Sequence, residues 1–442
     1  MFELMLRTEK IPCGIFGIKF IPQLFIIHYI GGNVKIMKKP ELLAPAGDLI
    51  KLKTAIDYGA DAVYIGGKAF SLRVASDNFS YSDMKEGISY AHNRGKKVYV
   101  AINIIAHNKD FENLKSYLKE LEELEVDGVI VADLGIMNTI KTYAPKLNLH
   151  VSTQASITNF ETVKFYKENL GAKRVVLARE LSLAEIKEIR KNNPDLEIEC
   201  FVHGAMCISY SGRCLLSNYM TGRNSNEGDC AQSCRWKYHL MEEKRPGEYM
   251  PVYEDDRGTF IFNSKDICMI EHIDKLIEAG VTSFKIEGRV KSEYYVATVV
   301  KAYRDAIDDY FLGKPFNKDL KEELKKISHR KYTEGFYFGK PDSSAQVYTT
   351  NSYVRNYELV GTVVDYLSDT KEVVIEQRNR FFKDDELEIL MPSSPFLKIK
   401  ATKIINEDNE EIDVAPHPKM RVRIPCDTKI PIGSFVRKEK SL

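Results

Sequence analysis

The 442-residue sequence lacks an excess of charge of either sign, because 64 lysines and arginines stand against 63 aspartates and glutamates. A net charge of +1 gives no overall attraction to nucleic acid or acidic lipid, so any such partner must be held by a local patch. Eight cysteines are too few for a disulfide scaffold. With 44% hydrophobic and 29% charged residues, the composition excludes both a disordered chain and a membrane-embedded one.

The sequence also lacks a clean hydrophobic run of the length that a membrane-spanning helix needs. Its most apolar stretch, residues 11–30, is interrupted by Pro12, Lys19, Pro22 and His28 and shows no clear signal-peptide cleavage site. We therefore expect a cytoplasmic protein with no membrane partner. Because a regular pattern begins only after Met37, we expect the protein to start at Met37. Residues 1–36 would then lie outside the native protein or form a disordered extension, with an extra packed helix as the alternative.

From residue 40 onward one sequence pattern is repeated: a helical stretch ends near a glycine, and four to six aliphatic residues follow. Short apolar runs of this kind suit strands buried on both faces of a parallel sheet. Between them, residues 111–124 place four leucines on one helical face, Leu114, Leu118, Leu121 and Leu124. Candidate strands begin near Glu41, Ala62, Lys97, Gly128, His150, Arg174, Glu197 and Ser283.

Eight strands with helical crossovers predict an α/β fold of the (β/α)8 TIM-like barrel type over residues 37–340. An open, doubly wound sheet is the alternative, since counting strands does not show closure. No Gly-x-Gly-x-x-Gly opens the first unit, which excludes the usual dinucleotide site. The gap at about 204–282 is far longer than the others and predicts an insertion.

Polar residues follow the predicted strands, at the end of the barrel where such enzymes place their sites. For each one, a rim salt bridge or a helix cap is the alternative interpretation. These residues are Asn103, Asp133, Gln154, Arg179, Glu180, His203, Glu287 and Arg289.

Beyond residue 345 the pattern changes to short runs of period-two alternation, such as 372–376 and 421–425, separated by turn residues. This predicts a small C-terminal antiparallel β barrel over residues 345–442. Within it, residues 378–383 interleave basic and aromatic side chains, a composition that can contact RNA but more often marks an exposed strand edge.

Five of the eight cysteines lie between Cys200 and Cys234, four of them in the insertion with the spacing C-x6-C-x15-C-x3-C. In a chain without an export signal, four thiols favour a metal over disulfides. The wide first pair and the position at a barrel mouth favour a [4Fe-4S] cluster over zinc. The expected ligands are Cys207, Cys214, Cys230 and Cys234, with Cys268 as an alternative to Cys234. Cys200 and Cys426 are expected in core positions.

These motifs resemble the collagenase-like peptidase family U32. The resemblance rests on Glu199-x-Phe201-x-His203-Gly204-x-x-Cys207-x6-Cys214-x-x-Ser217 and on four further stretches, and spans about residues 38–440. These stretches are Pro40-Glu-Leu-Leu-Ala-Pro-Ala-Gly47, Asn263-Ser-Lys-Asp266, Lys285-Ile-Glu-Gly-Arg289, and His329-Arg-Lys-Tyr332 with Gly335-Phe-Tyr-Phe-Gly339. The pattern is most similar to the family's tRNA hydroxylation branch.

The resemblance implies an enzyme that makes 5-hydroxyuridine at the wobble position, with an iron–sulfur cluster and prephenate as co-substrate. The partners would be the tRNA anticodon region, a small dicarboxylate and a possible subunit of the same family. On this hypothesis His203, Glu287 and Glu180 carry protons. Arg179 and Arg289 hold the dicarboxylate, because a guanidinium binds a carboxylate bidentately, and Gln154 and Asn103 complete the binding site.

The family's older name implies proteolysis, so a peptidase is the alternative function. The sequence has neither His-Glu-x-x-His nor Gly-x-Ser-x-Gly. A Cys207–His203 nucleophile pair is conceivable, but a thiolate bound to a cluster is unavailable for attack. A non-catalytic RNA-binding factor is a third hypothesis.

Overall fold

The computed structural model describes two units of the chain, residues 1–39 and 40–442, with gaps. In the first unit β1 (Phe25–Ile30) and β2 (Asn33–Lys38) form an antiparallel hairpin. The packed helix considered for this segment is therefore wrong for its described part, and the proposed start at Met37 stays a prediction. The described residues are 25–30, 33–68, 70, 78–206, 216–223, 230–233, 239–240, 250–251, 263–339, 346–347, 354–392 and 396–440.

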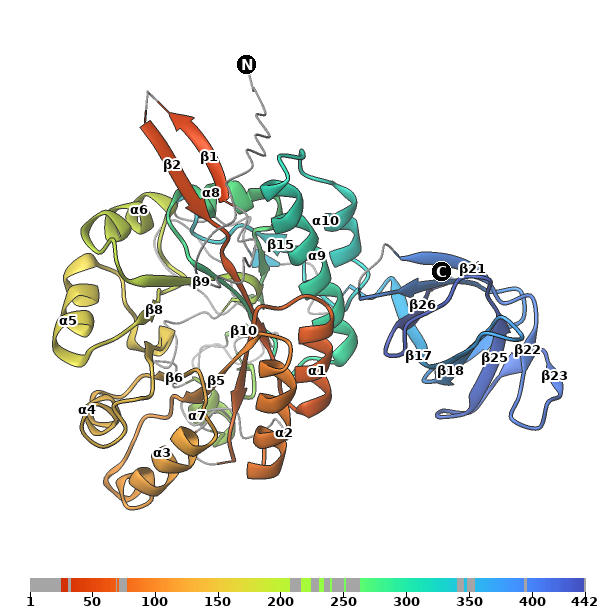
Figure 1. The fold of residues 1–442 in the computed structure, drawn as a ribbon, viewed down its shortest axis with the longest axis horizontal. Helices are drawn as coiled ribbons and strands as arrows, with labels where there is room; N and C mark the ends of the chain where they lie inside the picture. The colour runs from red at the N-terminus through yellow and green to blue at the C-terminus, as the bar shows by residue number, and fades with distance from the viewer. Residues whose placement is uncertain are drawn as a thin grey trace, which may run out of the picture. The chain divides into compact units, whose positions relative to one another are not determined.

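Eight parallel strands form a closed ring in the second unit (Figure 1). The last strand of the ring pairs with the first and also with the seventh, so the sheet has no free edge in the barrel. The structure thus confirms the (β/α)8 barrel and excludes the open sheet. The strands are β3 (Glu41–Pro45), β4 (Ala62–Gly66), β5 (Lys97–Ile102), β6 (Gly128–Val131), β7 (Leu149–Val151), β8 (Arg174–Val176), β9 (Glu197–Ala205) and β14 (Ser283–Ile286).

Six of the described helices, α1, α2, α4, α5, α6 and α9, begin where a side chain accepts from one of their first backbone N–H groups. Asp133, for example, accepts from the N–H of Ile136 at 3.0 Å, which makes the helix-cap interpretation the right one for this residue. Three of the predicted leucines lie within α3 and the fourth at its C-cap, and all are buried as expected. The helices are α1 (Leu49–Asp57), α2 (Tyr81–His92), α3 (Leu114–Glu123), α4 (Leu134–Tyr143), α5 (Phe160–Leu170), α6 (Leu183–Asn192), α8 (Ile273–Glu278), α9 (Glu293–Phe311) and α10 (Asp319–Leu324).

The predicted insertion lies between β9 and β14. Its described parts are α7 (Leu216–Thr221), the pair β10 (His239–Leu240) and β11 (Met250–Pro251), β12 (Asn263–Ser264) and β13 (Asp266–Cys268). β13 runs antiparallel to β9 and parallel to β15 (Tyr332–Thr333), while β12 pairs with β16 (Gln346–Val347). The insertion is thereby joined to the barrel sheet at the carboxyl end of β9.

The C-terminal domain, residues 357–439, is an antiparallel sheet that curls into a half-barrel around its own apolar core. Among its described strands the pairing order ends at β21 and β23, which do not pair with each other. In the basic and aromatic run, Phe381 is fully buried in this core and Phe382 is exposed. The strands are β17 (Tyr357–Leu367), β18 (Glu372–Gln377), β20 (Glu386–Leu390), β21 (Leu397–Lys400), β22 (Ile404–Ile405), β23 (Glu411–Ile412), β25 (Arg421–Pro425) and β26 (Phe435–Glu439), beside the pair β19 (Phe381–Phe382) and β24 (Val414–Ala415).

Two predicted core cysteines are confirmed, since Cys200 in β9 and Cys426 after β25 are both buried. The domain bounds 37–340 and 345–442 stay predictions. Among the described residues no helix combines the length and the hydropathy that a membrane span requires.

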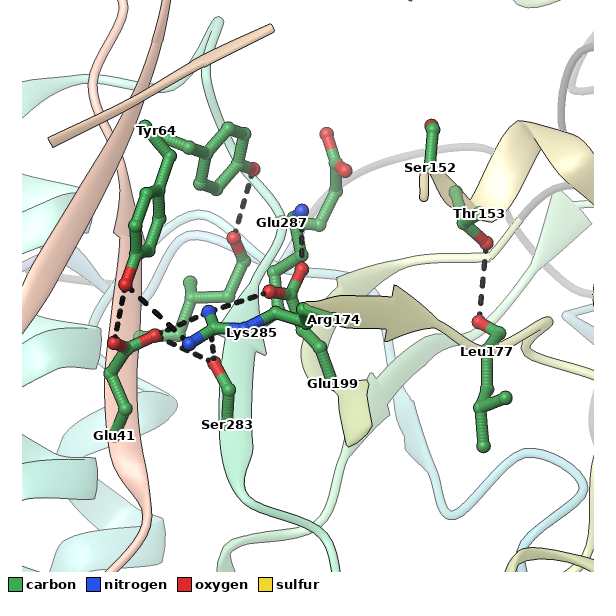
Figure 2. Close-up of polar contacts among 12 residues, drawn as sticks. Glu41, Tyr64, Ser152, Thr153, Arg174, Leu177, Glu199, Ser283, Lys285 and Glu287 are labelled. Atoms are coloured by element: carbon green, nitrogen blue, oxygen red, sulfur yellow. Dashed lines mark hydrogen bonds and ion pairs between the residues drawn. The ribbon is translucent and has the colours of Figure 1, made fainter. Parts of the chain in front are cut away.

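A buried ion network fills the barrel at the amino ends of its strands (Figure 2). Arg174, only 2% exposed, donates to Glu41 at 2.6 Å, to Glu197 at 2.6 Å and to Glu199 at 3.1 Å. Glu199 also accepts from the ammonium group of Lys285 at 2.6 Å. Burial alone would raise the pKa of Glu41, but Arg174 and the Tyr99 hydroxyl hold it below its ordinary value.

We expect Arg174→Met to lower the free energy of unfolding at pH 7 by about 3–5 kcal/mol, because buried carboxylates lose their partner. A carboxyl with a lowered folded-state pKa adds stability above the unfolded value, about 4.3, and this stability is lost as the pH falls through the folded-state pKa. The difference between the two proteins should therefore shrink at pH 4, where the variant's carboxyls take up protons. Urea titrations at both pH values measure it.

The matched control is Lys167→Met, which removes an exposed ion pair with Asp195, 3.7 Å away. It should cost less than about 1 kcal/mol. An equal cost for the two substitutions, or a cost for Arg174→Met that does not change with pH, would contradict the ion-network explanation.

Candidate active site at the mouth of the barrel

Close backbone contacts shape the carboxyl end of the barrel, and glycines make them possible. A Cβ on Gly47 would lie 2.2 Å from the carbonyl oxygen of Arg289. A Cβ on Gly204 would lie 2.8 Å from that of Glu287, and Gly204 also has a φ of +108°. Only glycine fits such positions, so β9 and the segment after β14 approach each other closely at the mouth.

Arg179 and Glu287, predicted independently, are in direct contact. The Arg179 guanidinium lies 3.2 Å from the Glu287 carboxylate and 3.9 Å from the ring centre of Phe201, over its face. Both charged side chains are largely buried, at 11% and 15% exposure. The rim ion pair considered for Glu287 is thus present, and it fixes the direction of a guanidinium at the mouth.

Glu180 follows Arg179 and is half-buried. Burial raises the pKa of its carboxyl above the ordinary value, although backbone N–H groups and Arg179 favour the charged form. A raised pKa is what a carboxyl needs to act as a proton donor near neutral pH. The catalytic role itself stays a prediction.

His203 is buried against three tyrosine rings. The ring centres of Tyr295, Tyr303 and Tyr332 lie 6.0, 5.6 and 5.4 Å from that of His203. Burial lowers the pKa of His203 to about 3, so the imidazole is neutral at physiological pH. Its carbonyl oxygen accepts from the N–H of Glu287 at 2.9 Å, which ties β9 to the site. A neutral imidazole with so low a pKa is a weak base.

The other predicted binding residues lie around the same end of the barrel. Gln154 is in the turn after β7, where its backbone N–H donates to the hydroxyl of Ser152 at 3.3 Å. The hydroxyl of the preceding residue, Thr153, donates to the carbonyl oxygen of Leu177 (Figure 2). Asn103 follows β5 and is half-buried, and Arg289 follows β14 and is 4% exposed. The structure places these side chains at the mouth, and their binding roles stay predictions.

Two of the five candidate cluster ligands lie within the described residues, and Cys207, Cys214 and Cys234 lie outside them. Cys230 is exposed, and its sulfur accepts the N–H of Gln232 at 3.4 Å. Cys268 is buried in β13, in register with His203, and burial raises the pKa of its thiol to about 11. Among the described residues no group of three or more His, Cys, Asp or Glu is arranged to hold a metal.

Sequence reasoning missed a buried layer behind the mouth. Asp266 accepts the backbone N–H of Arg330 at 3.1 Å and lies 3.4 Å from its guanidinium, while the ring of His329 stacks on Tyr332 at 4.6 Å. The signal was present, because residues 263–266 and 329–332 are two of the motifs that carry the family resemblance. What those motifs do not show is that they pair with each other.

The model of "Peptidase family U32" matches residues 47–347, and that of "Peptidase family U32 C-terminal domain" matches residues 355–437. The chain belongs to peptidase family U32.

Relatives in the family carry more than one kind of name. "tRNA hydroxylation protein P1" of Bacillus subtilis is 45% identical over 415 residues, covering 93% of this chain and 97% of that protein. "tRNA hydroxylation protein P" of Escherichia coli is 39% identical over 437 residues, covering 88% and 94%. A protein of Methanocaldococcus jannaschii named an uncharacterized protease is 44% identical over 351 residues, covering 77% and 84%.

The glycine contact in this U32 chain can be tested by Gly204→Ala. The new Cβ meets Glu287, so we expect a loss of more than about 2 kcal/mol in the free energy of unfolding, from steric overlap in addition to backbone strain. Gly171→Ala is the control, because Gly171 also has a positive φ, +69°, but nothing lies within 4 Å of its Cβ position. It should lose only about 1 kcal/mol. Equal losses in urea titrations would show that the contact with Glu287 does not matter.

Proposed function

We propose that this protein hydroxylates tRNA, converting the wobble uridine to 5-hydroxyuridine. The observation that carries the proposal is 45% identity, over 93% of the chain, to a protein named for tRNA hydroxylation. The polar barrel mouth supports it, since barrel enzymes build their sites at this end. The target uridine must leave its stack to enter such a mouth, so the partner is the anticodon region of a tRNA.

The co-substrate in this proposal is a small dicarboxylate of the prephenate type. Arg179 supports this because Glu287 and Phe201 hold its guanidinium in one direction before a ligand arrives. A preorganised guanidinium loses little freedom when it binds a carboxylate. Arg289 is the second cation at the same end of the barrel, suited to a second carboxylate. Gln154 and Asn103 would supply neutral hydrogen bonds.

A [4Fe-4S] cluster is the proposed cofactor, bound by Cys207, Cys214 and Cys230 with Cys234 or Cys268. The described cysteines fit such a group. Cys230 is accessible and already accepts an N–H on its sulfur. Cys268 of β13 pairs with His203 of β9, four residues before Cys207 in the sequence. When bound, the cluster would supply electron transfer.

The protein's own groups would then handle protons and exclude water. Glu180, with its raised pKa, is the proposed proton donor. Glu287 holds Arg179 and is placed to exchange a proton with a ligand on that guanidinium. His203 stays neutral and, with its three tyrosine neighbours, forms a dry wall beside the site.

A peptidase is the second candidate, favoured by the name of the Methanocaldococcus jannaschii relative. Its nucleophile would be Cys207, activated by His203. Activation requires a base that takes the thiol proton near neutral pH, and the buried His203 has a pKa of about 3. The hydroxylase proposal is therefore the better supported of the two.

Deleting the gene should remove 5-hydroxyuridine and its derivatives from the cell's tRNA. Mass spectrometry of tRNA nucleosides measures this, with restoration by the wild-type gene and not by the Cys207→Ala variant. Unchanged nucleosides, together with gelatin cleavage by the pure protein that survives Cys207→Ala, would favour the peptidase. Full function in all cysteine variants would favour a non-catalytic RNA-binding factor.

Anaerobic purification should give a brown protein with an absorption band at about 400 nm, which arises from charge transfer in an iron–sulfur cluster. We expect Cys207→Ser, Cys214→Ser and Cys230→Ser to lose most of the iron and the colour, and only one of Cys234→Ser and Cys268→Ser to do so. Cys426→Ser, a buried cysteine of the C-terminal domain, is the control that should keep both. A colourless, zinc-loaded wild-type protein would end the cluster proposal.

A further inference from the structure

Arg437 lies at a junction between the barrel and the C-terminal domain. It belongs to β26 and is fully buried. Its guanidinium contacts Glu388 of its own domain at 2.9 Å, but it also contacts two groups of the barrel, the carboxylate of Glu323 at 2.5 Å and the hydroxyl of Tyr294 at 3.4 Å. A fully buried guanidinium is stable only where its partners are held in place, so the two parts of the chain meet here in one defined geometry.

A second cation crosses the junction in the opposite direction. Lys326, just after α10 of the barrel, lies 2.8 Å from Glu388 of the C-terminal domain and 2.6 Å from Glu323. It also lies 4.4 Å from the ring centre of Phe396. Glu323 and Glu388 thus each contact both Arg437 and Lys326, and the exposed Lys398 lies 3.8 Å from Glu388 at the edge of this cluster.

A third contact comes from Tyr58, the C-cap residue of α1. Tyr58, 1% exposed, donates its hydroxyl to the carbonyl oxygen of Leu390 at 2.9 Å and lies 3.2 Å from that of Gly433, both in the C-terminal domain. Its ring centre lies 5.9 Å from that of Phe435. The junction therefore combines ion pairs, hydrogen bonds to backbone and aromatic packing, drawn from three separate segments of the barrel.

Helix α9 connects this junction to the mouth of the barrel. Tyr294 contacts Arg437, and the next residue, Tyr295, donates its hydroxyl to the carbonyl oxygen of Glu287 at 3.0 Å. Two turns further along, the hydroxyl of Tyr303 donates to Val202 at 2.7 Å and accepts the N–H of Met269 at 3.1 Å. One helix thus contacts the C-terminal domain and both strands that frame the site.

We infer that the junction of Arg437, Glu388, Glu323, Lys326 and Tyr58 holds the C-terminal domain to α9 in one fixed orientation. RNA bound at that domain's basic and aromatic run, residues 378–383, where Phe382 is exposed, would then be presented to the mouth at a set position. The presentation of RNA rests on the proposed function, whereas the fixed orientation does not. Arg437 is on this view a positioning residue. A domain that only tethered the substrate would not need a buried ion cluster at its attachment.

The test uses variants on the barrel side, which leave the inside of the C-terminal domain unchanged. Tyr58→Phe removes the hydroxyl that bonds Leu390, and Glu323→Gln removes a charge from the cluster; they are made singly and together in the full chain. The matched control is Glu372→Gln, because Glu372 is as buried as Glu323, at 11% against 12%, but pairs with Arg423 inside the C-terminal domain.

The first measurement needs no RNA. We expect the double variant to keep its circular dichroism spectrum, to show a larger radius of gyration in small-angle X-ray scattering, and to exchange the amide hydrogens of β20 and β26 about tenfold faster. Tyr58→Phe alone should show a smaller change in the same direction, and the control none. If the double variant shows the same scattering and hydrogen exchange as the wild type, the proposal that these contacts fix the domain's orientation is wrong.

The second measurement compares hydroxylation of full-length tRNA and of an anticodon stem-loop. For the double variant we expect KM for full-length tRNA to rise about tenfold while kcat and the stem-loop reaction change little, because only the larger RNA reaches both parts. If scattering and hydrogen exchange show that the domain is loosened but KM for full-length tRNA is unchanged, the proposal that the domain presents RNA to the mouth is wrong. A wild-type protein that hydroxylates neither RNA would refute the proposed function and leave the scattering result standing.

Discussion

The ion network around Arg174 is the constraint on which the barrel depends. It joins β8 to β3 through Glu41 and to β14 through Ser283, whose hydroxyl lies 3.3 Å from the guanidinium. β3 and β14 are the first and last strands of the ring. Where they pair and close the barrel, their side chains also bind the buried guanidinium of Arg174. The network occupies the amino end of the barrel, and the predicted site residues lie at the opposite, carboxyl end, where barrel enzymes place their chemistry.

Local patterns were enough to predict the barrel strands, and closure was the part they could not show. Strands such as 128–131 are buried on both faces, so they appear in the sequence as continuous apolar runs after a helix. Arg174 begins its strand and looks like a solvated edge residue in the sequence. It becomes buried only because the ring closes around it, which depends on pairing between residues more than 200 positions apart. The hairpin at residues 25–38 has no such periodic signal.

For the site too, the sequence predicted which residues lie at the mouth but not which of them are in contact. Carboxyl ends of neighbouring parallel strands must meet, so Arg179, Glu287 and His203 were expected at one mouth. Which of them touch depends on register and rotamer, and the Arg179–Glu287 contact was therefore open beforehand. The tyrosines around His203 come from a helix and a short strand far along the chain, and no spacing rule relates them to it.

Helix α9 explains how the second domain is integrated with the first. An outer helix of a barrel normally buries one face, as α3 does with its leucines. In α9 seven consecutive residues, 294–300, are all buried, which cannot occur on a helix with a solvated face. The barrel sheet covers one side and contacts such as Tyr294–Arg437 cover another. Apolar residues on all sides of a helix thus indicate, in the sequence, that the helix packs against two partners. In α9 one of these contacts includes Glu287 at the barrel mouth, and the other is with the C-terminal domain.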